Sequence, residues 1–147
     1  MTKAKSPSIN ISLSYSTDDG QTWTDITVSS STTFTTINTG DKIIFKGVNT
    51  RLATAWDTYY KFNPSKNFKV YGNAMSLLHG DNFASNSEFP SGSNNNFAGL
   101  FYGTTTLTDA SNLILPATIC TNGCYNGMFR GCTNLTVAPE LPATRSA

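Results

Sequence analysis

The sequence has little charge, and neither sign dominates. Only 13% of its 147 residues are charged, and ten Lys and Arg residues stand against nine Asp and Glu residues. Proteins that bind nucleic acid or anionic lipid through counterion release carry clusters of basic residues. Because the chain contains no run of Lys or Arg, we expect no nucleic acid among its partners.

Long apolar runs are also missing. No segment approaches the roughly 20 apolar residues of a membrane-spanning helix, so we expect no membrane insertion. Residues 1–8 carry the positive charge of a signal peptide without the apolar stretch that follows it. If residue 1 is the true start, the general secretory route is excluded. That leaves an intracellular protein, a virion component released by lysis, or a surface protein whose signal has been removed.

Histidine and cysteine are scarce. Cys120, Cys124 and Cys132 fall in one short stretch, and the single histidine, His79, lies far from them. A structural zinc site requires four nitrogen or sulfur ligands, and an odd number of cysteines cannot form a closed disulfide framework. We therefore expect three small buried thiols, with no metal site and no cofactor.

Catalytic constellations are equally sparse. Glycoside hydrolysis requires two carboxyl groups at a fixed separation, and the two glutamates, Glu88 and Glu140, fall in a polar loop and a Leu-Pro turn. The sequence has no nucleophile elbow and no phosphate-binding loop. A Ser-His-Asp triad around His79 stays open as a weak alternative. We expect no catalytic residues and predict that the protein is not an enzyme.

The N-terminal half of the sequence contains a series of short β-type segments. Ile11 and Leu13 alternate with serines, which is the two-residue period of a half-buried strand. We expect strands over residues 9–15, 22–28, 32–37, 42–46, 58–62 and 67–71, with turn residues between them. The pattern predicts a mainly β chain that begins with an antiparallel β-sandwich over residues 1–72. A short helix and a polar connecting loop are expected over residues 73–96.

One turn in the predicted sandwich carries a motif. Five residues match the Asp-box pattern Ser-x-Asp-x-Gly-x-Thr-Trp: Ser16, Asp18, Gly20, Thr22 and Trp23. The motif is familiar from sialidases, but its chemistry is structural, because the Asp accepts backbone hydrogen bonds inside a hairpin turn. A sialidase-like enzyme would need several copies and an arginine cluster. The single copy therefore favours a structural turn.

The best ligand-binding candidates by sequence are Arg51, Trp56, Tyr59 and Tyr60. On a strand, Trp56 and Tyr60 would lie on one side and Tyr59 on the other. Sugars stack on exposed aromatic rings, and Trp and Tyr anchor protein interfaces. The alternative, which we favour, is that these rings fill the core.

The most informative feature is an internal repeat. Residues 97–110 align with residues 125–138 at a fixed offset of 28, and the two segments share one half of their residues. The identical pairs are Gly99/Gly127, Phe101/Phe129, Gly103/Gly131, Thr105/Thr133, Leu107/Leu135, Thr108/Thr136 and Ala110/Ala138. A Leu-Pro-Ala-Thr string also recurs at residues 115 and 141. Periods of this length are typical of leucine-rich solenoids, in which each unit supplies a strand and a return.

A single unit cannot bury its apolar face alone, so the units should stack. We predict a repeat core of Phe101, Leu107, Leu115, Phe129, Leu135 and Leu141. Thr104 replaces Cys132 in the first copy, as expected of a capping unit beside a different neighbour. Two units in residues 97–147 are fewer than the roughly three that a free solenoid needs. They should therefore dock onto the sandwich or continue elsewhere.

The stretch from Cys124 to Thr136, followed by Pro-Glu-Leu-Pro-Ala-Thr, resembles the BspA-type leucine-rich repeat. The resemblance covers residues 97–144. Such repeats occur in surface proteins of Bacteroidales and in their phages. The resemblance implies a non-enzymatic attachment module in a virion tail or fibre, or on the cell surface. Its partner would be a surface protein, a glycan or another virion protein, with a homo-oligomer as a further option. The alternative is a carbohydrate-binding accessory module of a glycan-degrading system.

Overall fold

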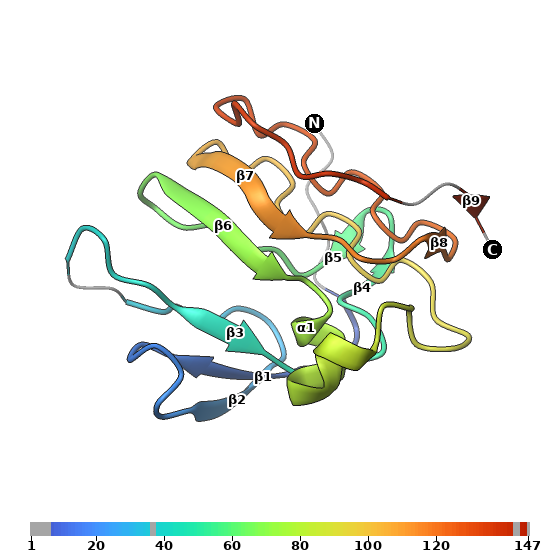
Figure 1. Cartoon of the computed structure of the whole chain (residues 1–147), viewed down its shortest axis with the longest axis horizontal. Helices are drawn as coiled ribbons and strands as arrows, with labels where there is room; N and C mark the ends of the chain where they lie inside the picture. Colours follow the sequence, from blue (N-terminus) through green and yellow to red (C-terminus); the bar gives the residue numbers. More distant parts are fainter. Residues whose placement is uncertain (1–6, 36–37, 143–144, 147) are drawn as a thin grey trace.

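The computed structural model describes residues 7–35, 38–142 and 145–146 and is mainly β (Figure 1). Its strands are β1 (Ile11–Ser16), β2 (Thr24–Val28), β3 (Ile44–Lys46), β4 (Ala53–Ala55), β5 (Thr58–Tyr59), β6 (Phe68–Asn73), β7 (Leu107–Ile114), β8 (Ile119–Cys120) and β9 (Arg145–Ser146). One α-helix, α1 (Ser76–His79), continues into a 3-10 helix, η1 (Gly80–Ser85). Within these described ranges, no helix has the length and apolar character needed to cross a membrane.

The first three strands form an antiparallel sheet in the order β2-β1-β3. Ile11 lies opposite Val28, and all the β1–β2 pairs keep one continuous register. Ile11 and Leu13 are buried while Ser12 is exposed, so the predicted alternation is confirmed over these residues; it does not continue to Ser16, which is buried. The apolar side chains of this face pack into the core.

The predicted six-strand sandwich is wrong in its later strands. Residues 32–35 form no strand, and residues 36–37 of that prediction lie outside the described residues. β5 pairs with β4 in a small hairpin, and β6 pairs in parallel with β7. These segments leave the sheet because their backbone groups bond to the repeat: the Phe62 N–H donates to the Leu100 carbonyl and the Phe68 N–H to the Thr106 carbonyl.

Three consecutive passes of the chain lie side by side, in the same direction. We call residues 52–74 the first pass, residues 95–120 the second and residues 122–142 the third. Backbone hydrogen bonds join the first pass to the second from Leu52 to Asn96 and from Ala74 to Ile114. Figure 1 shows the order of the layers, with the β1–β3 sheet at one end, then β6, β7 and the third pass.

The second and third passes follow the 28-residue offset. The N–H groups of Phe97, Gly99, Phe101 and Gly103 donate to the carbonyls of Cys124, Asn126, Met128 and Arg130. Each acceptor lies one residue before the repeat equivalent of its donor, and the spacing of the bonds is constant. Further along, Asp109 bridges to Val137 in parallel, and β8 pairs in parallel with β9.

A single hydrophobic core runs through the sheet and the passes. It contains Ile11 and Val28 from the sheet, Leu52 from the first pass, and Phe97 and Met128 from the repeat. Residues from all three expected segments, 1–72, 73–96 and 97–147, therefore share one core. Burial of a common apolar surface makes the folding of the sheet depend on the folding of the repeat.

The helical turn connects the first pass to the β1–β3 sheet. The short helix predicted within residues 73–96 is confirmed by α1, in which Leu77 and Leu78 are buried. The Asn73 side chain accepts the Met75 N–H just before the helix. The Ser76 carbonyl accepts the Gly47 N–H directly after β3.

Candidate functional site

The Asp-box residues form a compact hydrogen-bonded turn between β1 and β2. The Asp18 carboxylate accepts the Thr22 N–H at 2.9 Å and the Thr22 hydroxyl at 2.6 Å. The Ser16 hydroxyl donates to Asp18 and accepts the Gly20 N–H. Gly20 has φ of 85°, a region that favours glycine, and its carbonyl accepts the Trp23 indole N–H at 3.0 Å.

The turn also fixes the charge of its carboxyl group. The hydrogen bonds from Thr22, then that from Ser16, lower the pKa of Asp18 to about 2. The Lys46 ammonium lies 4.0 Å from the centre of the Trp23 ring and pairs with Asp81. The hydrogen bonds among Ser16, Asp18, Gly20, Thr22 and Trp23 therefore satisfy the polar side chains of the motif within the turn itself.

The four aromatic and basic candidates do not form one exposed platform. Trp56 is 60% exposed in the turn between β4 and β5, whereas Tyr59 and Tyr60 are only 6% and 9% exposed. Both tyrosines are buried because each enters a different cluster: Tyr60 packs in the main core and Tyr59 packs with Ala53 and Ala98. Arg51 is half-buried just before the first pass.

Tyr60 connects the first pass to the N-terminal sheet. Its hydroxyl lies 2.7 Å from the Ile9 carbonyl oxygen and 3.0 Å from that of Val28. Burial raises the pKa of the hydroxyl, which stays a neutral donor. The contact makes Tyr60 a packing residue, so Trp56 alone among the four presents a large ring to solvent.

The predicted repeat core is confirmed in part: Phe101 and Phe129 stack, whereas Leu141 is exposed and is not a core residue. The Phe101 and Phe129 rings lie 5.6 Å apart and 8° from parallel, and those of Phe97 and Tyr125 lie 6.1 Å apart and 12° from parallel. Leu107 and Leu115 are buried, Phe129 and Leu135 are half-buried, and Leu141 is 57% exposed. Burial therefore decreases from the second pass to the third.

Side-chain donors reinforce the backbone bonds between passes. The Thr108 hydroxyl donates to the Phe68 carbonyl at 3.0 Å, and its repeat equivalent, the Thr136 hydroxyl, donates to the Thr108 carbonyl at 2.9 Å. The Thr104 hydroxyl donates to the Phe62 carbonyl, and the Cys132 thiol, its equivalent, donates to the Phe101 carbonyl. Threonine in the first copy and cysteine in the second thus both bond to the pass before them.

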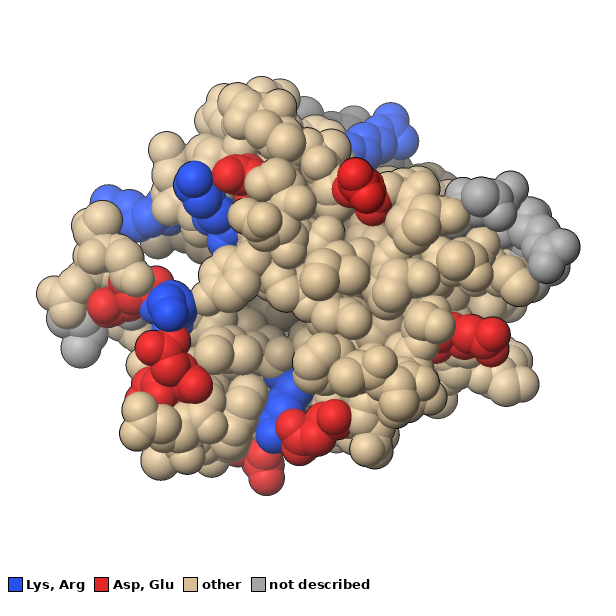
Figure 2. Space-filling view, in the orientation of Figure 1, with Lys and Arg blue, Asp and Glu red and all other residues tan. Residues whose placement is uncertain are grey.

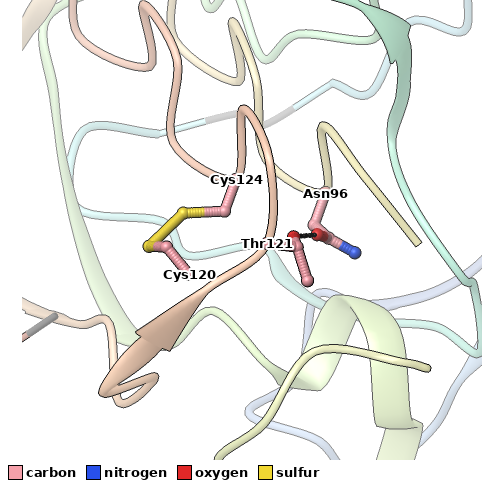
Figure 3. Close-up of a disulfide and its surroundings, with 4 residues drawn as sticks. All are labelled: Asn96, Cys120, Thr121 and Cys124. Atoms are coloured by element: carbon pink, nitrogen blue, oxygen red, sulfur yellow. Dashed lines mark hydrogen bonds between the residues drawn. A yellow bond between two sulfur atoms is a disulfide. The ribbon is translucent and has the colours of Figure 1, made fainter. Parts of the chain in front are cut away.

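Two of the three cysteines form a disulfide, so the prediction of three free thiols is wrong. Figure 3 shows Cys120, at the end of β8, bonded to Cys124 across a tight turn. The turn brings their Cα atoms to 5.7 Å, within the normal range for a disulfide. Cys132 is buried as a free thiol, and burial raises its pKa. An odd cysteine count still permits one local pair.

Beside the disulfide lies a buried amide that the sequence did not indicate (Figure 3). Asn96 is fully buried, its amide nitrogen donates to the Thr50 carbonyl and the Ser93 hydroxyl, and its amide oxygen accepts the Thr121 hydroxyl. It belongs to a polar stretch that we assigned to a surface loop. No local pattern distinguishes Asn96 from the asparagines before it.

The outer face of the parallel strands carries exposed apolar side chains. Tyr71, Ile114 and Val137 are 55%, 53% and 48% exposed. In the strand register Tyr71 lies opposite Asn112, Asn73 opposite Ile114, and Asp109 beside Val137. We call this surface the strand face and define it by Lys69, Tyr71, Asp109, Asn112, Ile114 and Val137.

Charge on the strand face is confined to one pair. The Lys69 ammonium lies 3.3 Å from the Asp109 carboxylate. Hydrogen bonds from Ser111, and then Lys69, lower the pKa of Asp109. Figure 2 shows charged side chains of both signs scattered over the visible side of the molecule, with wide uncharged areas between them. No single sign gathers there to select a strongly charged ligand.

A hollow of about 360 Å³ opens on the third pass. Its lining is mainly apolar and includes Tyr125, Met128, Phe129 and Leu141. Burial raises the pKa of Tyr125 to about 12, with the Ala117 backbone as a smaller, opposing influence. Among the described side chains the Tyr125 hydroxyl makes no hydrogen bond of normal geometry.

The groups that catalysis or metal binding would use lie apart. The His79 ring nitrogen contacts the Glu88 carbonyl at 2.9 Å, and the carboxyl pKa values that shift, those of Asp18 and Asp109, are lowered. In the described ranges no three His, Cys, Asp or Glu side chains gather to hold a metal ion. No protein-family model, curated protein or solved structure matches this chain.

Proposed function

We propose that the protein is a non-enzymatic recognition module whose strand face binds a protein or glycan surface. The exposed apolar row of Tyr71, Ile114 and Val137 carries this proposal. Isolated apolar residues are ordinary on a protein surface, but these three lie on neighbouring parallel segments of the three passes. Tyrosine and aliphatic side chains around a single ion pair are suited to an interface with an apolar centre.

The stacked passes support the assignment of a short leucine-rich solenoid of the BspA type. The second and third passes keep the 28-residue offset in backbone bonds, ring stacking and threonine bonds. The first pass supplies the third coil that two units lack, and the β1–β3 sheet covers it. We therefore propose a setting in a phage tail or fibre, or on a Bacteroidales cell surface.

The carboxyl groups favour binding over catalysis. A general acid requires a carboxyl pKa raised toward the working pH. The resolved shifts, at Asp18 and Asp109, go downward, and each is caused by hydrogen bonds that stabilise local structure.

Binding of the fluorescently labelled full chain to Bacteroidales cells tests the proposal. We expect saturable binding that Tyr71→Ala weakens about tenfold or more, as for an interface anchor. Thr33→Ala, at an exposed position outside the three passes, is the control and should bind as wild type. Equal binding by wild type and Tyr71→Ala would contradict a role for the strand face. Detection of the chain among the peptides of purified particles would support the virion setting.

Trp56 favours the second candidate function, a carbohydrate-binding accessory module. Its exposed indole is the kind of surface on which sugar rings stack. On a glycan array, this function predicts binding that Trp56→Ala abolishes and Tyr71→Ala leaves intact. The reverse pattern would reject the accessory module and favour the strand face.

A further inference from the structure

The outer edge of the third pass presents a row of backbone donors. In the second pass, Phe97, Gly99, Phe101 and Gly103 donate their N–H groups to the third pass. Their repeat equivalents are Tyr125, Gly127, Phe129 and Gly131. Within the described part of the chain, none of these four N–H groups has a hydrogen-bond partner.

Two half-buried aromatic rings, Tyr125 and Phe129, lie along the same edge. Phe101 stacks on one face of the Phe129 ring and Phe97 on one face of the Tyr125 ring. Both outer rings also line the hollow, together with the exposed Leu141. The edge therefore repeats, in donors and in rings, the surface that the second pass presents to the third.

The two ends of the stack differ. The β1–β3 sheet covers the first pass through Tyr60 and through the Gly47 N–H bond to Ser76. The third pass has no such cover among the described residues. Two copies placed edge to edge would set N–H donors against N–H donors, so a second copy does not complement this row.

We propose that this edge docks a segment of a partner polypeptide in the turn-rich conformation of the second pass, which presents backbone carbonyls at alternate positions and aromatic side chains four residues apart. The carbonyls would accept the N–H groups of Tyr125, Gly127, Phe129 and Gly131. The aromatic side chains would stack on Tyr125 and Phe129 and fill the hollow. Such docking extends the existing contact between the second and third passes, and it does not depend on the function of the strand face. As in recognition at a sheet edge, main-chain bonds would supply the affinity and side-chain pockets the specificity.

A synthetic peptide of residues 94–112 tests the proposal, because it carries the pattern without cysteine. It is titrated into the isotope-labelled full chain, and the amide signals are followed by NMR. We expect saturable shifts concentrated at Tyr125, Gly127, Phe129 and Gly131. A peptide with Phe97→Ala and Phe101→Ala should bind at least about tenfold more weakly, since it lacks both rings.

Two variants of the full chain locate the site. Leu141→Asp places a charge at the hollow, on a side chain that is already exposed, and should weaken peptide binding about tenfold. Val48→Asp makes the same change at a position 76% exposed on the N-terminal side and should leave binding unchanged. Absence of shifts at peptide concentrations of about 1 mM would overturn the proposal. So would shifts centred elsewhere, or self-association that protects the four amides without peptide.

Discussion

At the scale of single residues, Asn96 joins three separate segments of the chain. Its side chain bonds to Thr50 before the first pass, to Ser93 in the connecting loop and to Thr121 beyond β8. A buried polar group removed from such a network leaves its partners unsatisfied, and that loss exceeds the value of one hydrogen bond.

Asn96→Ala should lower the free energy of unfolding by about 2–4 kcal/mol, because the Thr50 carbonyl and the Thr121 hydroxyl lose their partner. Urea unfolding followed by circular dichroism measures the change. Asn94→Ala, two residues away at an exposed position, should change stability by less than about 0.5 kcal/mol. Equal effects of the two substitutions would contradict the network.

Asp18 gives the turn a specific pH dependence. Its pKa falls from 3.8 to about 2 on folding, so its ionised form stabilises the fold above pH 3.8. That stabilisation is lost as the pH falls from 3.8 to about 2. The stability difference between wild type and Asp18→Asn should therefore be constant near neutral pH and shrink through this interval. Urea midpoints across a pH series test this.

Thr22→Val is the companion variant for the turn, because the Thr22 hydroxyl is the first cause of the lowered pKa of Asp18. It should weaken the pH dependence while leaving the carboxyl group in place. A stability difference that does not vary with pH in Asp18→Asn would show that the turn does not hold the carboxylate.

At the scale of elements, the repeat glycines have two different roles. Gly99 and Gly103 both adopt positive φ, at 66° and 67°. A Cβ on Gly99 would overlap the Tyr59 ring, whereas one on Gly103 would meet nothing within 4 Å. The first glycine allows the close approach of the β4–β5 hairpin, and the second serves only the backbone turn.

Gly103→Ala should therefore cost about 1–2 kcal/mol of stability, from the left-handed conformation alone. Gly99→Ala should cost about 1–3 kcal/mol more than Gly103→Ala, because Tyr59 must shift in a packed cluster. Thermal and urea unfolding of the two variants measure the difference. In a Tyr59→Ala background, the stability cost of Gly99→Ala should fall to about that of Gly103→Ala. If the two costs stay different in that background, the contact with the Tyr59 ring is not the cause.

The disulfide predicts a simple thiol count. Under denaturing conditions without reductant, iodoacetamide should label Cys132 alone, and after reduction it should also label Cys120 and Cys124. Mass spectrometry of chain produced in an oxidising compartment reads the difference. The short loop corresponds to about 2 kcal/mol of stabilisation. Full labelling without reductant would show that the pair does not form.

Sequence predicted the elements whose signal is local or periodic. The alternation at Ile11 and Leu13 predicted β1, and the offset of 28 anticipated the stacking of Phe101 on Phe129. The parallel pairing of β6 with β7 was not predictable. Phe68 of β6 lies opposite Leu107, but the segment around Phe68 does not carry the repeat motif. Burial of Tyr59 and Tyr60 agrees with the favoured interpretation that these rings fill the core. The sequence did not indicate that the two adjacent rings enter separate clusters.

At the scale of the whole molecule, the β1–β3 sheet, the first pass and the two repeat units form one stack around a common core. One end is covered by the sheet and the other presents unpartnered backbone donors among the described residues. The proposed strand face runs along the side of this stack, and the proposed docking edge lies at its uncovered end. Both proposals depend on the parallel register between passes.

Amide hydrogen exchange of the native chain, resolved by NMR, tests that register most directly. The N–H groups of Phe97, Gly99, Phe101 and Gly103 donate to the third pass and should be strongly protected. Those of Tyr125, Gly127, Phe129 and Gly131, the same positions one repeat later, should exchange fast. Equal exchange in the two sets, whether both fast or both protected, would contradict the stacked architecture with one uncovered edge.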